Sequence, residues 1–145
     1  MRVKICGLHP LRDVKLCIDL GVNFLGFVFY EKSPRNLNLN DIQKLKSYNK
    51  KKSFFVAVTV NPNNDFIENV ILNNFDYIQL HGSETEERIE EIRSKGIKII
   101  KTRYKFICSP RWQSLLIQQV SPIHRNFDIF MVNGRSVSYT HLRAH

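Results

Sequence analysis

Short apolar stretches alternate along this chain with amphipathic stretches. Six apolar stretches have the length and composition of buried strands: residues 3–6, 24–30, 53–60, 75–80, 97–102 and 126–132. Five other stretches repeat apolar residues at helical spacing: 11–20, 39–48, 64–74, 83–96 and 109–120. Strands that alternate with helices predict an α/β fold with a parallel sheet, because each helix returns the chain to the same end of the sheet.

Residues typical of helix ends support these boundaries. Gly21 follows the first predicted helix, and Asn40 is a plausible N-cap for the second. Ser83 with Glu86 three residues later predicts a capping box for the fourth helix, which we expect to stop at Gly96.

Two architectures fit this order of elements: an open doubly wound sheet and a (β/α)8 barrel. No Gly-x-Gly-x-x-Gly or P-loop pattern occurs, which weakens the nucleotide-binding version of the open sheet. A complete barrel needs about 250 residues and eight repeats. With 145 residues, we expect an incomplete TIM barrel with about six βα units in one domain.

Charge narrows the choice of partners. The chain has 22 Lys and Arg against 13 Asp and Glu, a net charge of +9. Such a chain binds either a small anionic molecule or nucleic acid. The densest basic run, residues 50–52, is best explained as a solvated loop, and no RNP-like strand or zinc-finger spacing accompanies it. We therefore expect a small anionic substrate and no nucleic acid.

Other classes are disfavoured by what the sequence lacks. No apolar run approaches the ~20 residues of a membrane span, and the first residues do not form a signal peptide. We expect a cytoplasmic protein without a membrane partner. Cys6, Cys17 and Cys108 are an odd number without a Cys-x-x-Cys pair, which argues against a disulfide framework and against a zinc site.

Candidate chemistry lies where the predicted strands end. Parallel α/β proteins gather their functional groups beyond the carboxyl ends of the strands. The residues expected there include a thiol, an imidazole and three cations: Cys6, His81, Arg35, Lys101 and Arg103. This end of the sheet should be positive and should suit an anion.

Each of these residues also has a purely structural explanation. Cys6 alone would most often be a small buried hydrophobe, although a position just before a helix favours the thiolate. His81 alone is more often a hydrogen-bonded structural imidazole than a catalyst. Arg35 alone is usually a surface charge, but Ser33 and Pro34 stiffen its loop and could aim it at a carboxylate.

Four motifs together resemble a known family. They are VKICGL (3–8), LGFVFYEKSPR (25–35), VAVTVN (56–61) and IQLHGSET (78–85). In this order and spacing they resemble the N-terminal motifs of phosphoribosylanthranilate isomerase, an enzyme of tryptophan biosynthesis. The resemblance implies a (β/α)8 barrel that converts N-(5-phosphoribosyl)anthranilate into 1-(2-carboxyphenylamino)-1-deoxyribulose 5-phosphate. This Amadori rearrangement proceeds by two proton transfers and implies neither a cofactor nor a metal.

The resemblance also assigns roles to residues. Cys6 matches the general base, and Arg35 matches the residue that holds the anthranilate carboxylate. His81 falls in the fourth-strand motif and would line the site, while Gly7 would let the backbone pass close to the substrate. The resemblance leaves open fusion to, or association with, other enzymes of the tryptophan pathway.

The sixth predicted strand departs from the family pattern. Asn133 takes the position of the family's general-acid aspartate at the strand tip, and an amide cannot donate a proton as a carboxylic acid does. Asp128 begins the same strand, which would place it at the opposite end of a parallel barrel from Cys6.

The end of the sequence departs further. Residues 136–145 follow no repeat, so we interpret 1–135 as a partial TIM-barrel domain and 136–145 as a non-native tail. The family's phosphate-binding loops after strands seven and eight have no counterpart in this sequence. We therefore expect this chain alone to be inactive, with strands one and six as exposed sheet edges.

Two other functions remain open from sequence. One is a different phosphate-sugar TIM-barrel enzyme, such as an indole-glycerol-phosphate synthase or a ribulose-phosphate epimerase relative. The first uses lysines and glutamates rather than a first-strand cysteine, and the second needs metal-binding histidines and aspartates. The other is a basic nucleic-acid-binding module, which is disfavoured because the basic residues are scattered over several elements.

Overall fold

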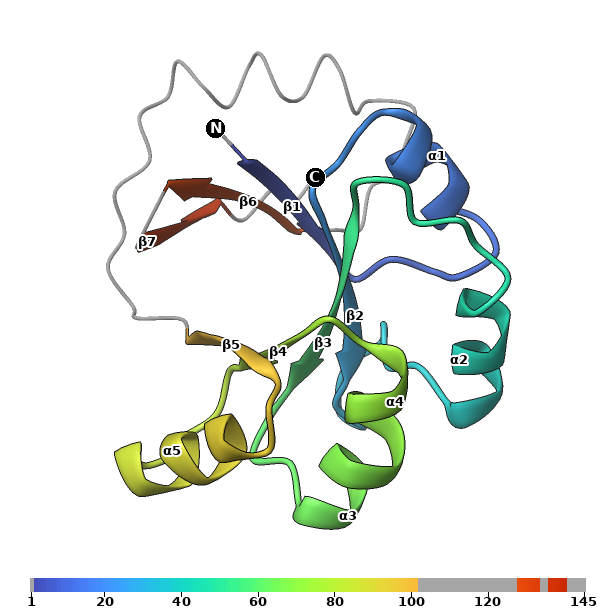
Figure 1. Cartoon of the computed structure of the whole chain (residues 1–145). Coiled ribbons are helices and arrows are strands. Elements are labelled where there is room, and N and C mark those ends of the chain that lie inside the picture. The colour runs from blue at the N-terminus through green and yellow to red at the C-terminus, as the bar shows by residue number, and fades with distance from the viewer. Residues whose placement is uncertain (1, 102–127, 134–135, 141–145) are drawn as a thin grey trace.

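The first five predicted strands are present and form one parallel sheet. The computed structural model describes residues 2–101, 128–133 and 136–140 (Figure 1). The parallel strands are β1 (Arg2–Cys6), β2 (Phe24–Phe29), β3 (Phe54–Thr59), β4 (Tyr77–Leu80) and β5 (Lys98–Lys101). Their order in the sheet, β5-β4-β3-β2-β1, is their order in the chain.

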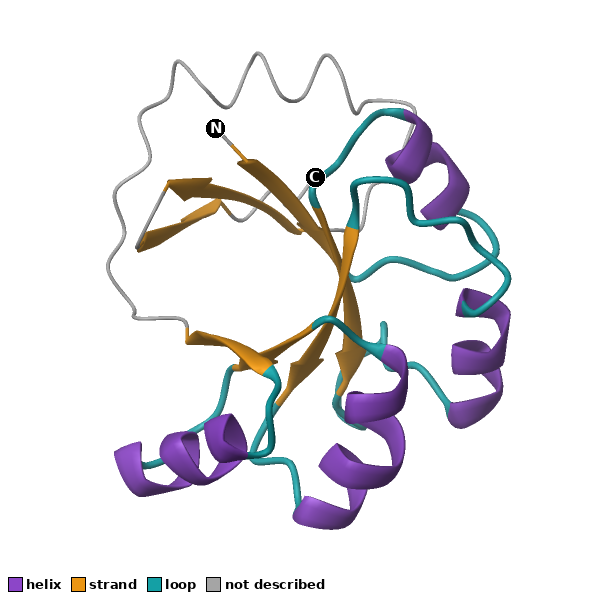
Figure 2. Ribbon diagram, viewed as in Figure 1, coloured by secondary structure: helices purple, strands orange, loops and turns teal. Residues whose placement is uncertain are grey.

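This order decides between the two architectures. A doubly wound sheet reverses its strand order at a switch point and carries helices on both faces. Strands β1 to β5 show no reversal, and the helices cover one face only, so the sheet curls into a half-barrel (Figure 2). The prediction of a barrel-type α/β fold is confirmed at this level.

The helices between the strands are short. They are α1 (Val14–Asp19), α2 (Leu39–Leu45), α5 (Glu86–Ser94) and one composite helix of α3 (Asn64–Phe66), η1 (Ile67–Ile71) and α4 (Leu72–Asn74). The segment η1 is a π-helix. No helix in the described part of the chain is long and apolar enough to cross a membrane.

Two predicted N-caps were wrong by two residues. Asn38, not Asn40, caps α2: it is extended, its side chain accepts from the Asp41 amide at 3.0 Å, and its own amide donates to Asp41 Oδ2 at 3.3 Å. Thr85, not Ser83, caps α5 by accepting from the Arg88 amide at 3.2 Å. In both cases two short polar residues lie two positions apart, and the backbone conformation decides which of the two is the N-cap.

Alternation along the strands separates two faces of the sheet. The convex face packs against the helices and forms the core, whose strand residues are Ile5, Leu25, Phe27, Phe55, Ala57, Ile78 and Leu80. The helices contribute Val14, Cys17, Ile18, Ile42, Leu45, Ile67, Ile71, Ile89 and Ile92. The concave face carries the intervening residues, among them Lys4, Cys6 and Gly26.

The sixth predicted strand exists but does not form a sixth parallel unit. Strand β6 (Asp128–Asn133) pairs antiparallel with β1, and β7 (Ser136–Thr140) pairs antiparallel with β6. Only two residues separate β6 from β7, a connection too short for a parallel crossover. The prediction of a parallel sixth strand was therefore wrong.

The sheet edges also differ from the prediction. β1 lies inside the sheet between β2 and β6, and β5 and β7 are the edges among the described strands. The predicted helix 109–120 lies outside the described residues. The interpretation of 136–145 as a non-native tail stays a prediction.

Candidate functional site

The candidate site is built around the carboxyl end of β1. Cys6 is the last residue of this strand and is 3% exposed. Ile5 points into the helix-covered core, so the alternation of the strand turns Cys6 to the concave face. The thiol thus lies on the inner side of the half-barrel, at the end where parallel α/β proteins place their chemistry.

Gly26 makes room for this thiol. It is the direct neighbour of Cys6 on β2, and a Cβ atom added to it would overlap Cys6 Sγ and lie 3.1 Å from Cys6 Cα. The carbonyl of Gly26 accepts from the amides of Gly7 at 2.9 Å and Leu8 at 3.2 Å. Sequence reasoning missed Gly26, although a glycine within an apolar strand is a signal of close approach.

Lys4 contacts the same thiol. Its side chain is fully buried on the concave face, and its Nζ donates to Cys6 Sγ. Residues i and i+2 of a strand share a face, which brings the two groups together. Sequence reasoning missed Lys4 as well, and its signal was a lysine inside a buried strand.

Arg35 reaches the same corner from the loop after β2. Gly7 has φ +83°, a conformation that glycine adopts without steric cost. A Cβ atom on Gly7 would lie 2.6 Å from Cδ and Nη1 of Arg35, so the arginine side chain packs directly over Gly7. The Arg35 amide donates to Ser33 Oγ at 3.2 Å, which helps to fix this loop. The structure therefore brings Cys6, Gly7 and Arg35 together.

His81 lies at the same end of the sheet but on a distant strand. It follows β4, is half-buried, and its amide donates to the Thr59 carbonyl at 2.9 Å. Three strand spacings of about 4.8 Å separate β4 from β1. We call the opening of the half-barrel at the carboxyl ends of β1 to β5 the mouth. His81 thus lies across the mouth from the cysteine.

Lys101 is committed to a neighbouring carboxylate. Its Nζ lies 2.8 Å from Glu84 Oε2, and the Glu84 side chain is 1% exposed. Burial alone raises the pKa of Glu84, but hydrogen bonds from Lys101 and from backbone amides, including that of Asn61, outweigh it and lower the pKa below its usual value. This pair fastens the loop after β4 to the end of β5. Of the three cations expected at this end of the sheet, Lys101 is thus paired with a carboxylate, Arg35 packs over Gly7, and Arg103 lies outside the described residues.

The structure does not bring Asn133 to the mouth. β1 and β6 run antiparallel, with Cys6 opposite Asp128 and Arg2 opposite Val132. Asn133 therefore lies beyond the amino end of β1, away from Cys6. The expected positions of Asp128 and Asn133 relative to Cys6 are reversed, because both followed from a parallel sixth strand.

Cys17 provides a contrast to Cys6. It lies in α1, fully buried between helix and sheet. Burial, with a smaller effect from Asp13, raises the pKa of the Cys17 thiol to about 12. This cysteine is a core residue and stays protonated at neutral pH. Among the described residues, no group of three or more His, Cys, Asp or Glu is arranged to hold a metal ion.

Comparison with known proteins identifies the family. The sequence model of the N-(5'-phosphoribosyl)anthranilate (PRA) isomerase family matches residues 3–116. The chain belongs to the phosphoribosylanthranilate isomerase family. The isomerase of Staphylococcus aureus N315 is 34% identical over 142 residues, which cover 96% of this chain. The isomerase of Rhizobium meliloti is 39% identical over 101 residues, 68% of this chain.

Solved structures of phosphoribosylanthranilate isomerases share the fold. One, in complex with reduced 1-(o-carboxyphenylamino)-1-deoxyribulose 5-phosphate, has a TM-score of 0.66 and 30% identity over 83% of this chain. The Thermotoga maritima isomerase has a TM-score of 0.65 with the same identity and coverage of this chain. The chain spans 64% of the length of the S. aureus relative and 61% of the chain in the complex.

Proposed function

We propose that this protein takes part in the isomerisation of N-(5'-phosphoribosyl)anthranilate in tryptophan biosynthesis. The observation that carries the proposal is the corner formed by Cys6, Gly7 and Arg35 on the inner side of the half-barrel. This corner combines a cysteine whose thiolate can accept a proton with a guanidinium that can bind a carboxylate. The names of the related enzymes supply the substrate.

The reaction needs one base. When the ribose ring opens, a Schiff base forms between C1 and the anthranilate nitrogen, and the iminium makes the C2 proton acidic. The Cys6 thiolate removes this proton: the C2–H bond breaks, an S–H bond forms, and the electron pair of C2 neutralises the iminium. The resulting enolamine tautomerises to the ketone. A positioned base typically contributes about 10²–10⁴-fold to such a step.

Arg35 would orient the substrate. A guanidinium presents two parallel N–H donors to a carboxylate, which fixes direction as well as position. Arg35 is packed over Gly7, next to Cys6, so an anthranilate carboxylate bound to it would bring the sugar end toward the thiol. His81 would line the opposite side of the mouth. Within the described part of the chain we assign no acid that protonates the ring oxygen, because Asn133 lies at the other end of β1.

Binding to this chain tests the role of Arg35. The reduced product named in the homologous complex is titrated into the 145-residue protein by calorimetry. We expect Arg35→Ala to weaken binding at least about tenfold, since a hydrogen-bonded charge pair contributes about 1.5–3 kcal/mol. Arg93→Ala, on the exposed side of α5, is the matched control. Equal affinities for the two variants would contradict the assignment.

Turnover tests the role of Cys6. We expect Cys6→Ala to lower the isomerisation rate by about 10²–10⁴-fold with little change in product affinity. The rate is measured by anthranilate fluorescence in a chain completed with the C-terminal part of the S. aureus relative. An unchanged rate would remove the thiol from the mechanism.

A further inference from the structure

Lys4 is a fully buried lysine on the concave face, and the reaction step proposed for Cys6 does not use it. Lys4 is 0% exposed and is among the largest fully buried side chains of the described residues. Lysine is almost never fully buried unless it is paired, because an ammonium group loses much solvation energy inside a protein. Its Nζ donates to Cys6 Sγ, within a buried pair.

The strand register gives the nearest described neighbours of this pair on β2 and β6. On β2, the register partners of Lys4 and Cys6 are Phe24 and Gly26, which carry none. Arg35 packs over Gly7, the residue that follows Cys6 in the chain. On β6, the backbone register places Asp128 opposite Cys6, the one acidic residue among the register partners of this pair.

Across the mouth, His81 follows β4, and Lys101 at the end of β5 is paired with Glu84. On the described β1 and β2 side, a positive group, Lys4, thus contacts the thiol directly. An opposite charge within about 4–6 Å favours the ionised form of an acid. A thiolate beside Lys4 also offsets part of the cost of burying the ammonium group.

We propose that Lys4 is a positioning residue for the Cys6 base: its ammonium group pairs with the Cys6 thiolate and holds it, ionised, at the carboxyl end of β1. The inference rests on the proposed function, in which Cys6 removes the C2 proton. In that step the C2–H bond breaks and the S–H bond forms, while Lys4 keeps its proton throughout. Lys4 thus stabilises the reactive form of the base without touching the substrate.

Thiolate absorbance at 240 nm measures this effect directly. The 145-residue chain is titrated from pH 5 to 11, and the signal of Cys6 is isolated by subtracting a Cys6→Ser variant. A free cysteine ionises near pH 8.5. We expect the Cys6 midpoint to lie below this value in the native chain and to rise by about 1–3 pH units in Lys4→Met.

Two further variants separate charge from packing. Lys4→Arg keeps the positive charge and should retain most of the low midpoint. Lys98→Met removes an exposed lysine of the same concave face, which lies 5.4 Å from the Tyr77 ring centre, and should leave the midpoint unchanged. Equal midpoints for Lys4→Met and the native chain would overturn the proposal.

The native chain also tests the proposal if Lys4→Met does not fold. A Cys6 midpoint at or above about pH 8.5 in the native chain would by itself overturn it. Failure of the proposed function looks different: Cys6→Ala would leave turnover unchanged while the midpoint still depended on Lys4. The two ideas are therefore tested separately.

Discussion

The Cys6 thiol occupies space that the neighbouring strand leaves open only because residue 26 is glycine. A Cβ atom added to Gly26 would overlap the sulfur atom of Cys6 and would lie 3.1 and 3.2 Å from the Cα and Cβ atoms of Cys6. Strand pairing fixes both backbones, so the side chain would have to move. Position 26 thus controls where the candidate base points.

We predict that Gly26→Ala destabilises the protein by about 1–3 kcal/mol, the usual cost of overpacking a core. Urea unfolding of the 145-residue chain measures the change. In a Cys6→Ala background the sulfur is absent, so the same substitution should cost less than half as much. Equal costs in the two backgrounds would show that the thiol is not the group displaced.

Cys17 makes stability depend on pH in the alkaline range. Its pKa is about 12 in the folded protein, whereas an unfolded cysteine ionises at about 8.5. Below the lower value the thiol is protonated in both states and has no effect. As pH rises further, the unfolded state loses a proton that the folded state keeps, and stability falls.

We therefore predict that the native chain loses more stability between pH 8 and 10 than Cys17→Ala does. The difference should grow with a slope approaching one proton per molecule. Urea midpoints at several pH values in this range give the comparison, which cancels the titration of lysines and tyrosines. Parallel pH curves would contradict the buried, protonated state of Cys17.

Sequence motifs located Cys6, Gly7 and Arg35, and the structure brings these three together. They did not reveal Lys4 or Gly26. In most sequences a lysine lies on the surface and a glycine lies in a turn, so neither residue indicates a site by its type. Lys4 and Gly26 matter here because strand register brings both of them next to Cys6. Register determines which residues share the concave face, and a single sequence does not show it.

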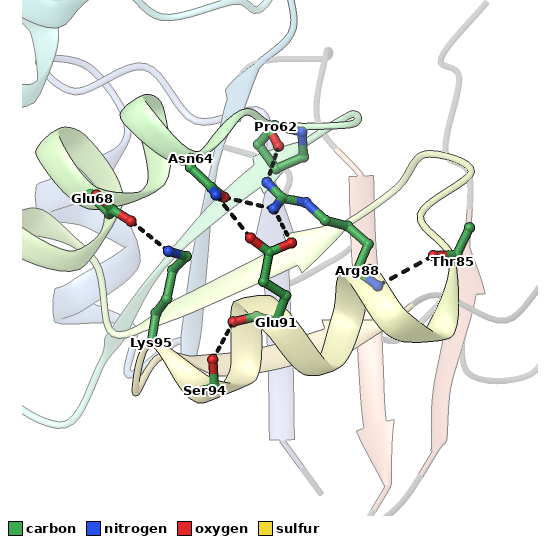
Figure 3. Close-up of polar contacts among 8 residues, drawn as sticks. All are labelled: Pro62, Asn64, Glu68, Thr85, Arg88, Glu91, Ser94 and Lys95. Atoms are coloured by element: carbon green, nitrogen blue, oxygen red, sulfur yellow. Dashed lines mark hydrogen bonds and ion pairs between the residues drawn. The ribbon is translucent and has the colours of Figure 1, made fainter.

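The helix α5 is fastened to the preceding βα unit by a polar network (Figure 3). Arg88 is its centre: Nη1 donates to Asn64 Oδ1 and Glu91 Oε2, each at 2.6 Å, and Nη2 donates to the Pro62 carbonyl at 2.8 Å. Asn64 also donates to Glu91 at 2.8 Å. The network ties the start of the composite helix to the middle of α5.

Further contacts extend this network toward the end of α5. Lys95 pairs with Glu68 of η1, and Ser94 Oγ donates to the Glu91 carbonyl at 2.7 Å. The loop after β4 carries His81 and leads directly into α5. Holding α5 in place therefore helps to hold one side of the mouth.

We predict that Arg88→Ala lowers stability by about 1–2 kcal/mol, because it removes three hydrogen bonds from a half-buried guanidinium. Arg93→Ala is the control. Arg93 lies on the same helix and pairs only with exposed Glu90 in the interactions described, so its loss should cost less than about 0.5 kcal/mol. Thermal unfolding of both variants gives the comparison, and equal shifts would show that the network adds nothing beyond an exposed ion pair.

Element types were predictable, but their details were not. The periodicity of residues 64–74 predicts one α-helix, whereas the structure inserts the π-helical segment η1. The N-caps of α2 and α5 lie two residues from their predicted positions. These details depend on small differences in backbone conformation between neighbouring polar residues, which apolar periodicity does not report.

At the scale of the molecule, the apolar strands and the motif order were enough to predict a barrel-type fold with β1 to β5 in sequential order. The pattern does not encode strand direction. The sequence of an apolar strand is similar whether the strand pairs parallel or antiparallel. We predicted a parallel β6 because we assumed that the βα repeats continue. The same assumption placed Asn133, rather than Asp128, at the end of the sheet where Cys6 lies.

The direction of β6 is testable with one native thiol. In the antiparallel register Asp128 is the direct partner of Cys6, at a Cα separation of about 4.5–5.5 Å, which a disulfide can bridge. We predict that Asp128→Cys forms a disulfide with Cys6 under mild oxidation and that Asn133→Cys does not. Both variants carry Cys108→Ser, and peptide mapping identifies the bond. The reverse result would mean that β6 runs parallel to β1.

The sequential order of the strands has a consequence for synthesis. Each of β2 to β5 pairs with the strand made about 20–30 residues earlier, so every new βα unit meets an edge that has just left the ribosome. The other edge of β1 must wait for β6, well over 100 residues later. Until then the oldest strand in the nascent chain keeps a row of unpaired amides and carbonyls, which makes it the place where a chaperone, or another unfinished copy, would first attach.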